Sequence, residues 1–330
     1  MPAGRLVFLA VERHLDDLAR SETPFRFDQA AAAHVIKFFR DFAPFSLTPQ
    51  QQFVAGSLFG WKDSAGARRF QSAYIETGKG SGKTPFAAGL ANYGLIADRE
   101  PEAEIYFAAV TKEQASIGFR DAVIMRDKSP DLRKVITKHK YNLSAGNSFI
   151  RPISSEHRGL DGKRPHIVLI DELHEHPTPL VVEKMRAGTK GRRQPLIFMI
   201  TNSGFDRETV CFYYHEYSRQ ILEHIAENDR FFAYICQLDP CEDCRLKGRE
   251  QPNCDNCDNW LDEDVWIKAN PNLGVTIQKE YLRGQVTEAL AIPAKQSIVQ
   301  RLNFCMWTQS EERAISPEAW KACAWEDEAA

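Results

Sequence analysis

The stretch YIETGKGSGKTPFAAGLANYGL, residues 74–95, places Gly78, Gly80 and Gly82 between a strand-like apolar run and an Ala/Leu-rich run. Glycine inside regular structure costs about 0.5–1 kcal/mol relative to alanine, so such a cluster indicates a backbone path or a close approach that side chains would block. A plain strand-to-helix turn and a phosphate-binding loop both fit the pattern. The rest of the chain decides between them.

Short apolar runs alternate with helix-like segments around this loop. Strands are predicted at 70–77, 104–110, 166–171 and 195–202, and helices at 84–98, 111–127 and 179–188. Short, almost wholly apolar strands that alternate with helices indicate a mainly parallel sheet covered on both faces, hence an α/β fold. Such sheets bind ligands beyond the carboxyl ends of their strands, so the residues that follow each strand are the first candidates for a site.

The glycine-rich loop fits a phosphate cradle, because its amides can point inward and the next helix adds the positive end of its dipole. Lys83 is expected to reach the β- and γ-phosphates of ATP, and the Thr84 hydroxyl to bind Mg²⁺. The pattern G-x-x-x-x-G-K-[ST] is only partly met, since Thr77 occupies the position of the first glycine. The expected ATP-binding residues of the loop are Gly78, Lys79, Gly80, Ser81, Gly82, Lys83 and Thr84.

A pair of acids ends the apolar strand in HIVLIDELHEHP, residues 166–177. Asp171 is expected to hold Mg²⁺ through its water shell, and Glu172 to align and deprotonate the attacking water. An ordinary polar strand terminus is the alternative. His174 and His176 stand two residues apart, which suits no chelation from one helix face, so we expect them on the surface near the site.

Polar residues also follow the strand PLIFMITN. Thr201 and Asn202 are expected to couple hydrolysis to movement, by contacting the γ-phosphate or the Glu172 carboxylate; a simple turn is the alternative. Upstream, Gln51 in LTPQQ carries both a donor and an acceptor and can read the edge of adenine. A helix start with a cap at Thr48 explains that stretch equally well.

Four of the eight cysteines lie in CEDCRLKGREQPNCDNC, residues 241–257. Two C-x-x-C knuckles can aim four thiolates at one point, which predicts a structural Zn²⁺ site. Reduced cysteines without metal and a redox pair are the alternatives. The expected zinc ligands are Cys241, Cys244, Cys254 and Cys257.

Length, composition and net charge indicate the class of protein. A chain of 330 residues with 43% hydrophobic residues is an ordinary globular protein, and a net charge of −3 gives no overall basic character. No apolar run approaches the roughly 20 residues of a membrane span, and no signal peptide is evident, so a cytoplasmic protein without membrane contact is expected. The expected organisation is a helical segment at 1–45, an ATPase core at 46–205 and a lid or linker subdomain at 206–330 that carries the cysteine insertion.

In this order the motifs resemble the large terminase subunit of tailed bacteriophages, the ATPase that packages DNA into a procapsid. The resemblance rests on LTPQQQFV, LFGW, ETGKGSGKT, AAVTKEQA, RGLDGKRPHIVLIDELHEH, LIFMITNSG, WIKANPNLG and RLNFCMWTQSEERAISPEAW. It implies a RecA-like, additional-strand P-loop ATPase fold with a small lid, in a ring around double-stranded DNA. It also implies a portal protein and a small terminase subunit as partners, the host bacterial cytoplasm as location, and a monomer in isolation.

The chain departs from the pattern of that family at two points. Members commonly carry an arginine in the phosphate loop where this chain has Lys79, which lacks the planar bidentate fork of arginine. Members also continue into a nuclease domain with several metal-binding carboxylates, and we expect neither that domain nor nuclease activity in this chain. Ring motors usually need an arginine from a neighbouring subunit, and Arg158 is the first candidate; a solvated loop arginine is the alternative.

Two other functions fit the motifs. One is a helicase-like DNA-dependent ATPase, which would need a second RecA-like domain after residue 205. The other is a non-hydrolysing zinc-containing adaptor that binds nucleotide only to fix its shape.

Overall fold

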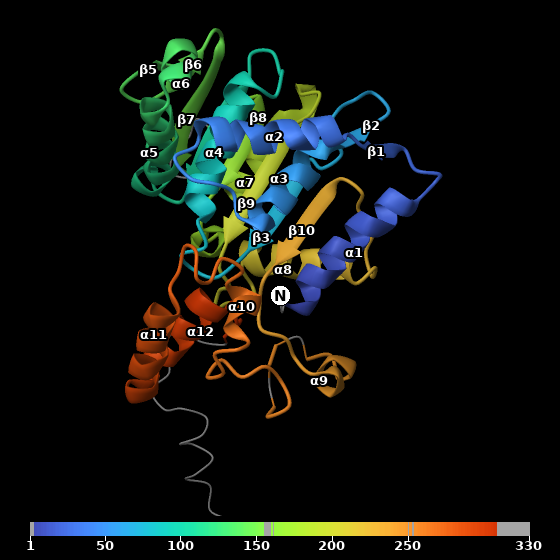
Figure 1. The fold of residues 1–330 in the computed structure, drawn as a ribbon, viewed down its shortest axis with the longest axis vertical. Helices are drawn as coiled ribbons and strands as arrows, with labels where there is room; N and C mark the ends of the chain where they lie inside the picture. The colour runs from blue at the N-terminus through green and yellow to red at the C-terminus, as the bar shows by residue number, and fades with distance from the viewer. Residues whose placement is uncertain (1–2, 155–159, 161, 250, 253, 309–330) are drawn as a thin grey trace, which may run out of the picture.

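An eight-stranded sheet runs through the centre of the molecule (Figure 1). The computed structural model describes residues 3–154, 160, 162–249, 251–252 and 254–308. The strand order is β10-β3-β9-β8-β4-β7-β6-β5. In that order the strands are β10 (Phe231–Ile235), β3 (Ser72–Glu76), β9 (Leu196–Thr201), β8 (Pro165–Ile170), β4 (Glu104–Ala109), β7 (Ser148–Ser154), β6 (Leu143–Ala145) and β5 (Thr137–Lys138).

The sheet is parallel from β10 to β7 and antiparallel from β7 to β5. Every residue of β8 and of β9 is buried, as their unbroken apolar sequences require. The predicted α/β class with a mainly parallel sheet is confirmed. The strands at 137–154 were not among the predicted elements, because their sequences lack unbroken apolar runs. Both residues of β5 are exposed, and β7 contains Arg151 and Pro152 in its middle.

Helices cover both faces of the sheet. Helices α4 (Lys83–Ile96) and α5 (Lys112–Lys128) contact β4 and β7. From β8 onward the chain moves the other way across the sheet, so right-handed crossovers put α7 (Leu180–Gly188) and α8 (Val210–Leu222) on the opposite face. The remaining short helices of this part are α6 (Pro130–Val135), η1 (Leu173–Glu175) and η2 (Thr189–Gly191).

The first 45 residues contain the expected helices, α1 (Arg5–Ala19) and α2 (Gln29–Phe42). Helix α1 contacts β10 and α8, and α2 lies across α3 (Pro49–Gly60). A short strand, β1 (Phe25–Phe27), separates the two helices and pairs antiparallel with β2 (Trp61–Asp63). The N-terminal helices therefore belong to the layers of the central unit.

A second, smaller hydrophobic core lies at one end of the sheet. Its helices are α10 (Trp266–Ala269), α11 (Lys279–Ala291) and α12 (Gln296–Phe304), with η3 (Pro293–Lys295) between the last two. Helix α9 (Glu242–Leu246) lies in the cysteine-rich segment and adds no residue to this core. Figure 1 shows α10 to α12, orange to red, below the sheet. The expected start of the lid at residue 206 needs correction, because α8 packs on the sheet and β10 pairs with β3 in register. The smaller core begins at Leu238.

No helix in the described part of the chain is long and apolar enough to cross a lipid bilayer.

Candidate nucleotide site

The loop after β3 presents an unbroken row of main-chain donors. Gly80 and Gly82 have φ angles of 87° and 75°, a region that favours glycine, and Gly82 is the N-cap of α4. Among the described residues, no acceptor receives a hydrogen bond from the amides of residues 80–84. Five consecutive unpaired N–H groups at the start of a 14-residue helix are an arrangement that binds phosphate.

The first part of the loop is held by the smaller core. The amide of Gly78 donates to the Ala269 carbonyl at 2.9 Å, and the amide of Lys79 donates to the Leu302 carbonyl at 2.7 Å. A Cβ at position 78 would lie 2.2 Å from Asn270 Oδ1, so only glycine fits there. The amides of Gly78 and Lys79 thus hold the start of the loop in place, and the amides that follow them are available to a ligand.

Lys83 lies under the loop. Its Nζ donates to the carbonyls of Thr77 and Gly78 at 2.9 and 3.3 Å, and to Asn202 Oδ1 at 3.4 Å. These acceptors are all neutral. A phosphate oxygen is charged and forms the stronger bond with an ammonium group, so the lysine is free to exchange these contacts for a nucleotide.

Thr84 and Asp171 bring the loop and the acidic strand end together. The Thr84 hydroxyl donates to Asp171 Oδ2 at 2.8 Å. Burial, and next the neighbouring Glu172 carboxylate, raise the pKa of Asp171 to about 6. A divalent cation at this point would offset both effects. Hydroxyl and carboxylate oxygens are the ligands that Mg²⁺ prefers, so these two residues fit the predicted magnesium site.

Glu172 has a strained backbone. Its φ is 49°, a left-handed value that costs a non-glycine residue about 1–3 kcal/mol. The strained turn is fixed by a hydrogen bond from its amide to Asp171 Oδ1 at 3.0 Å. The side chain is 41% exposed overall, but Oε2 is buried and lies 3.4 Å from His174 Nδ1. The carboxylate is thus partly open to solvent, as a group that binds water must be.

The two histidines after the acidic pair are buried, which corrects the expectation that they lie on the surface. The His174 side chain is 7% exposed, and both its main-chain N and its Nδ1 lie 3.1 Å from Thr201 Oγ1. His176 is 1% exposed, and burial lowers its pKa to about 4. The turn at residues 172–176 is therefore packed against the end of β9 rather than free in solvent.

Asn202 joins the loop to the smaller core. Its Nδ2 donates to the Thr77 carbonyl at 2.8 Å and to the Leu302 carbonyl at 3.1 Å. Thr201 lies next to it and donates through Oγ1 to the Asn202 carbonyl at 2.8 Å. The two expected coupling residues thus lie between the acidic turn, the phosphate loop and α12.

Gln51 has a structural role in this arrangement. Its Oε1 accepts from the Thr48 amide at 3.1 Å, which completes a capping box at the start of α3. Its Nε2 donates to the Gly82 carbonyl at 3.5 Å. The helix-start interpretation of LTPQQ is confirmed, and both ends of the Gln51 amide are engaged by the protein. Of the other candidates, Lys79 is exposed, and Arg158 lies outside the described residues.

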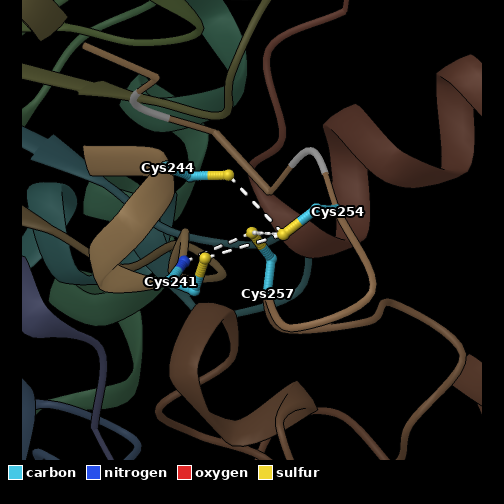
Figure 2. A group of neighbouring side chains, drawn as sticks. All are labelled: Cys241, Cys244, Cys254 and Cys257. Carbon is cyan, nitrogen blue, oxygen red and sulfur yellow. Dashed lines mark hydrogen bonds between the residues drawn. The ribbon is translucent and has the colours of Figure 1, made fainter. Parts of the chain in front are cut away.

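The four cysteines of the knuckles converge (Figure 2). Their ligand atoms all lie within 4.8 Å of one another, and three Sγ pairs are 3.6 Å apart. Four thiolates at 2.3 Å from a tetrahedral zinc ion stand about 3.8 Å from one another, so the cluster has the size of a zinc site. The Cys241 amide donates to Cys257 Sγ at 3.2 Å, which helps to stabilise a thiolate there.

Two family models match the chain. The model of the terminase large subunit ATPase domain matches residues 49–220, and that of the terminase large subunit endonuclease domain matches residues 252–328.

The chain belongs to the terminase large subunit family.

Two curated relatives match the chain. The chain is 28% identical over 163 residues to Protein YmfN of Escherichia coli, covering 49% of this chain and 32% of that protein. It is 22% identical over 264 residues to the large terminase subunit of Enterobacteria phage HK97, covering 76% of this chain and 47% of that protein. This terminase chain thus spans about a third to a half of the curated relatives it matches.

Solved structures show the fold. The HK97 bacteriophage large terminase matches with a TM-score of 0.70 at 18% identity, over 84% of this chain and 55% of that one. The large terminase ATPase domain of Thermus phage P74-26 matches with a TM-score of 0.53 at 17% identity, over 82% of this chain and 98% of that one. The predicted RecA-like α/β ATPase fold of this terminase is therefore confirmed.

One expectation about this terminase is wrong at the level of sequence. No part of the nuclease domain was expected, yet the endonuclease-domain model matches residues 252–328. The residues of that range which the structure describes include the second cysteine knuckle, Cys254 and Cys257, the loop that follows it and helices α10 to α12. The helices that contact the phosphate loop, α10 and α12, thus lie within the range that matches the endonuclease-domain model.

Sequence reasoning missed the asparagines of this terminase that contact the phosphate loop. Asn272 Nδ2 donates to the Ser81 carbonyl at 2.7 Å, and Asn270 Nδ2 donates to the Asn303 carbonyl at 2.7 Å. Both asparagines are at most 1% exposed. The signal was present in the stretch WIKANPNLG, where two asparagines flank a proline directly after the short helix α10, but the pattern alone names no partner.

Proposed function

We propose that this chain hydrolyses ATP as the motor part of a large terminase that moves double-stranded viral DNA into a procapsid. The observation that carries the proposal is the open row of amides at residues 80–84, which lies beside the contact between Thr84 and Asp171 at 2.8 Å. Membership of the terminase large subunit family supports the link to DNA packaging.

The loop binds the polyphosphate of ATP through its main chain. The unpaired amides of residues 80–84 and the N-terminus of α4 attract the β-phosphate. Lys83 then exchanges the carbonyls of Thr77 and Gly78 for phosphate oxygens. Lys79, on the exposed side of the loop, adds charge near the γ-phosphate without the bidentate geometry of an arginine.

Thr84 and Asp171 are the candidate ligands of Mg²⁺, directly or through water. A bound Mg²⁺ ion would supply positive charge that offsets the negative charge developing on the phosphates. The two residues already share a hydrogen bond, so they need little rearrangement to face a common ion.

Glu172 is the candidate general base. Its carboxylate is partly exposed, follows the Mg²⁺ candidate directly, and is held by a strained turn. A base in this position orients a water for in-line attack and accepts its proton. Thr201 and Asn202 couple the release of the γ-phosphate to movement of α12, because Asn202 contacts both the phosphate loop and α12. Arg158 of a neighbouring subunit remains the candidate for the arginine that acts in trans.

The cysteine cluster is proposed to hold one structural Zn²⁺ ion. Four thiolates close the coordination shell, which leaves no open position for catalysis. As far as the structure describes residues 241–257, none of their side chains belongs to either hydrophobic core, so a metal would take the place of a core in this segment.

The proposed partners follow from the family. They are double-stranded DNA, gripped mainly through its phosphates, a portal protein, a small terminase subunit, and further copies of the chain in a ring. The ring assembles on the portal in the host cytoplasm, and the chain alone is a monomer with low ATPase activity.

The test is ATP turnover by the chain and by Glu172→Gln, with and without double-stranded DNA. We expect the variant to lose at least 100-fold in turnover, on the order of the contribution of a general base, while it still binds ATP. An unchanged rate would exclude Glu172 as the base. Turnover that needs single-stranded DNA would favour a helicase-like ATPase, and ATP binding without turnover would favour the adaptor.

A further inference from the structure

Two acidic side chains flank the cysteine cluster and share one lysine. Asp239 lies two residues before Cys241, and Asp258 directly follows Cys257. Lys268 Nζ lies 3.2 Å from Asp239 Oδ2 and 2.9 and 2.7 Å from the two oxygens of Asp258. The aspartates also bind each other, since the Asp239 amide donates to Asp258 Oδ2 at 2.7 Å. One cation, the ammonium group of Lys268, therefore joins the two aspartates that flank the cysteine cluster.

The same lysine stands next to the residues that hold the phosphate loop. Lys268 is in α10, and the carbonyl of the next residue, Ala269, accepts from the Gly78 amide at 2.9 Å. Four residues beyond Lys268, Asn272 donates to the Ser81 carbonyl at 2.7 Å. A shift of α10 cannot leave these contacts unchanged, because they are made by the helix itself and by the turn that follows it.

The ion pairs at Lys268 are less exposed than others of the same region. The side chain of Lys268 is 20% exposed, and those of Asp239 and Asp258 are 16% and 15% exposed. The pair of Lys279 with Glu263, in contrast, is 38% and 32% exposed and holds α11 rather than α10. Exposed pairs contribute little, whereas breaking a partly buried cluster leaves charges without partners and moves the chain around them.

We infer that Lys268 is a positioning residue for the phosphate loop and couples the cysteine cluster to nucleotide binding. The inference rests on the proposed ATP-binding function. A metal in the cluster fixes the two knuckles, the knuckles fix the flanking aspartates, and Lys268 fixes α10 against them. Ala269 and Asn272 then hold residues 78–81 in the shape that accepts a polyphosphate. Whether the cysteine cluster holds a metal thereby changes the affinity of the phosphate loop for nucleotide.

The test measures the Kd of a fluorescent ADP with Mg²⁺ for the full chain, together with zinc content. We expect Lys268→Met to weaken binding about fivefold to tenfold, the lower range for coupled sites, with the zinc content unchanged. Removal of zinc from the parent by a chelator, followed by dialysis into Mg²⁺, should weaken binding by a similar factor. In Lys268→Met the same removal should change the Kd by less than about twofold, because the link is already broken.

Two controls separate this link from general loss of structure. Lys279→Met removes an ion pair of α11 and should bind as the parent does, and Lys268→Arg keeps the charge and should restore most of the affinity. The inference is overturned if zinc removal leaves the parent's Kd unchanged, or if Lys268→Met binds like the parent. A parent that binds no ADP would instead overturn the proposed function, and this inference with it.

Discussion

At the scale of single residues, the site combines groups that are unfavourable in the nucleotide-free protein. Asp171 is buried beside another carboxylate, and Glu172 has a left-handed backbone. Neither feature stabilises the fold, and both suit a protein that gains a cation and a polyphosphate on binding. Strained or charged residues of this kind are common at functional sites, where stability is lower than it could be.

Replacement of Asp171 by asparagine tests this directly. Because the pKa of Asp171 in the folded protein is about 6, above its ordinary value of 3.8, the folded state binds the proton more tightly than the unfolded state. The stability of the parent therefore falls as the pH rises from about 4 to 6, and Asp171→Asn, which carries no charge, avoids this loss.

We expect Asp171→Asn to exceed the parent by about 1–3 kcal/mol in free energy of unfolding at pH 8 without nucleotide, and to match it near pH 4. Denaturant titrations at both pH values measure the difference. The same variant should lose Mg²⁺-dependent nucleotide binding. A variant that is less stable than the parent at pH 8 would show that the Asp171 charge supports the fold.

At the scale of elements, local patterns predicted what lies within one strand, loop or helix. The phosphate loop, the acidic strand end and the central strands were all predicted, because each follows from short-range rules of glycine use and apolar runs. The contacts of the loop with α10 and α12 were not, since Asn272 and Ser81 are 191 positions apart in the chain. A contact between residues so far apart in the chain produces no hydrophobic period and no motif that a single sequence could show.

A methyl group at position 78 tests the contact between the loop and the smaller core. In Gly78→Ala the new Cβ would meet Asn270 Oδ1 and the Asn303 carbonyl, so the loop and α10 must move apart. We expect a loss of about 1–3 kcal/mol in stability and weaker nucleotide binding.

A second change should reverse part of that loss. Asn270→Gly in the same chain removes the side chain in the way, and should restore part of the nucleotide affinity. Gly284→Ala is the matched control, because nothing lies within 4 Å of the Cβ there and alanine favours its helix. Equal binding by Gly78→Ala and the parent would contradict a loop that is held by α10.

At the scale of the whole molecule, the chain consists of a RecA-like unit and a smaller core that closes its phosphate loop. The boundary between them lies near residue 238 rather than at 205, because β10 completes the sheet. The sequence could not reveal this, since an edge strand and a strand of a separate subdomain have the same apolar pattern. The cysteine spacing, in contrast, predicted a cluster that the fold brings together.

Loss of the metal should loosen only the smaller core. We expect zinc to fall from about one ion per chain to none in Cys241→Ser, with a lower melting temperature and faster hydrogen exchange in α10 while β3 and β8 stay protected. Cys236→Ala, which removes a buried cysteine of the sheet region, should keep its zinc. A parent chain without zinc would exclude the metal site.

A crystal structure of the chain with Mg²⁺ and a non-hydrolysable ATP analogue would test the proposed nucleotide site most directly. The proposed site predicts the β-phosphate on the amides of residues 80–84, Lys83 Nζ on the β- and γ-phosphates, and the metal between Thr84 and Asp171. An analogue bound elsewhere, with Lys83 still on the carbonyls of Thr77 and Gly78, would contradict it.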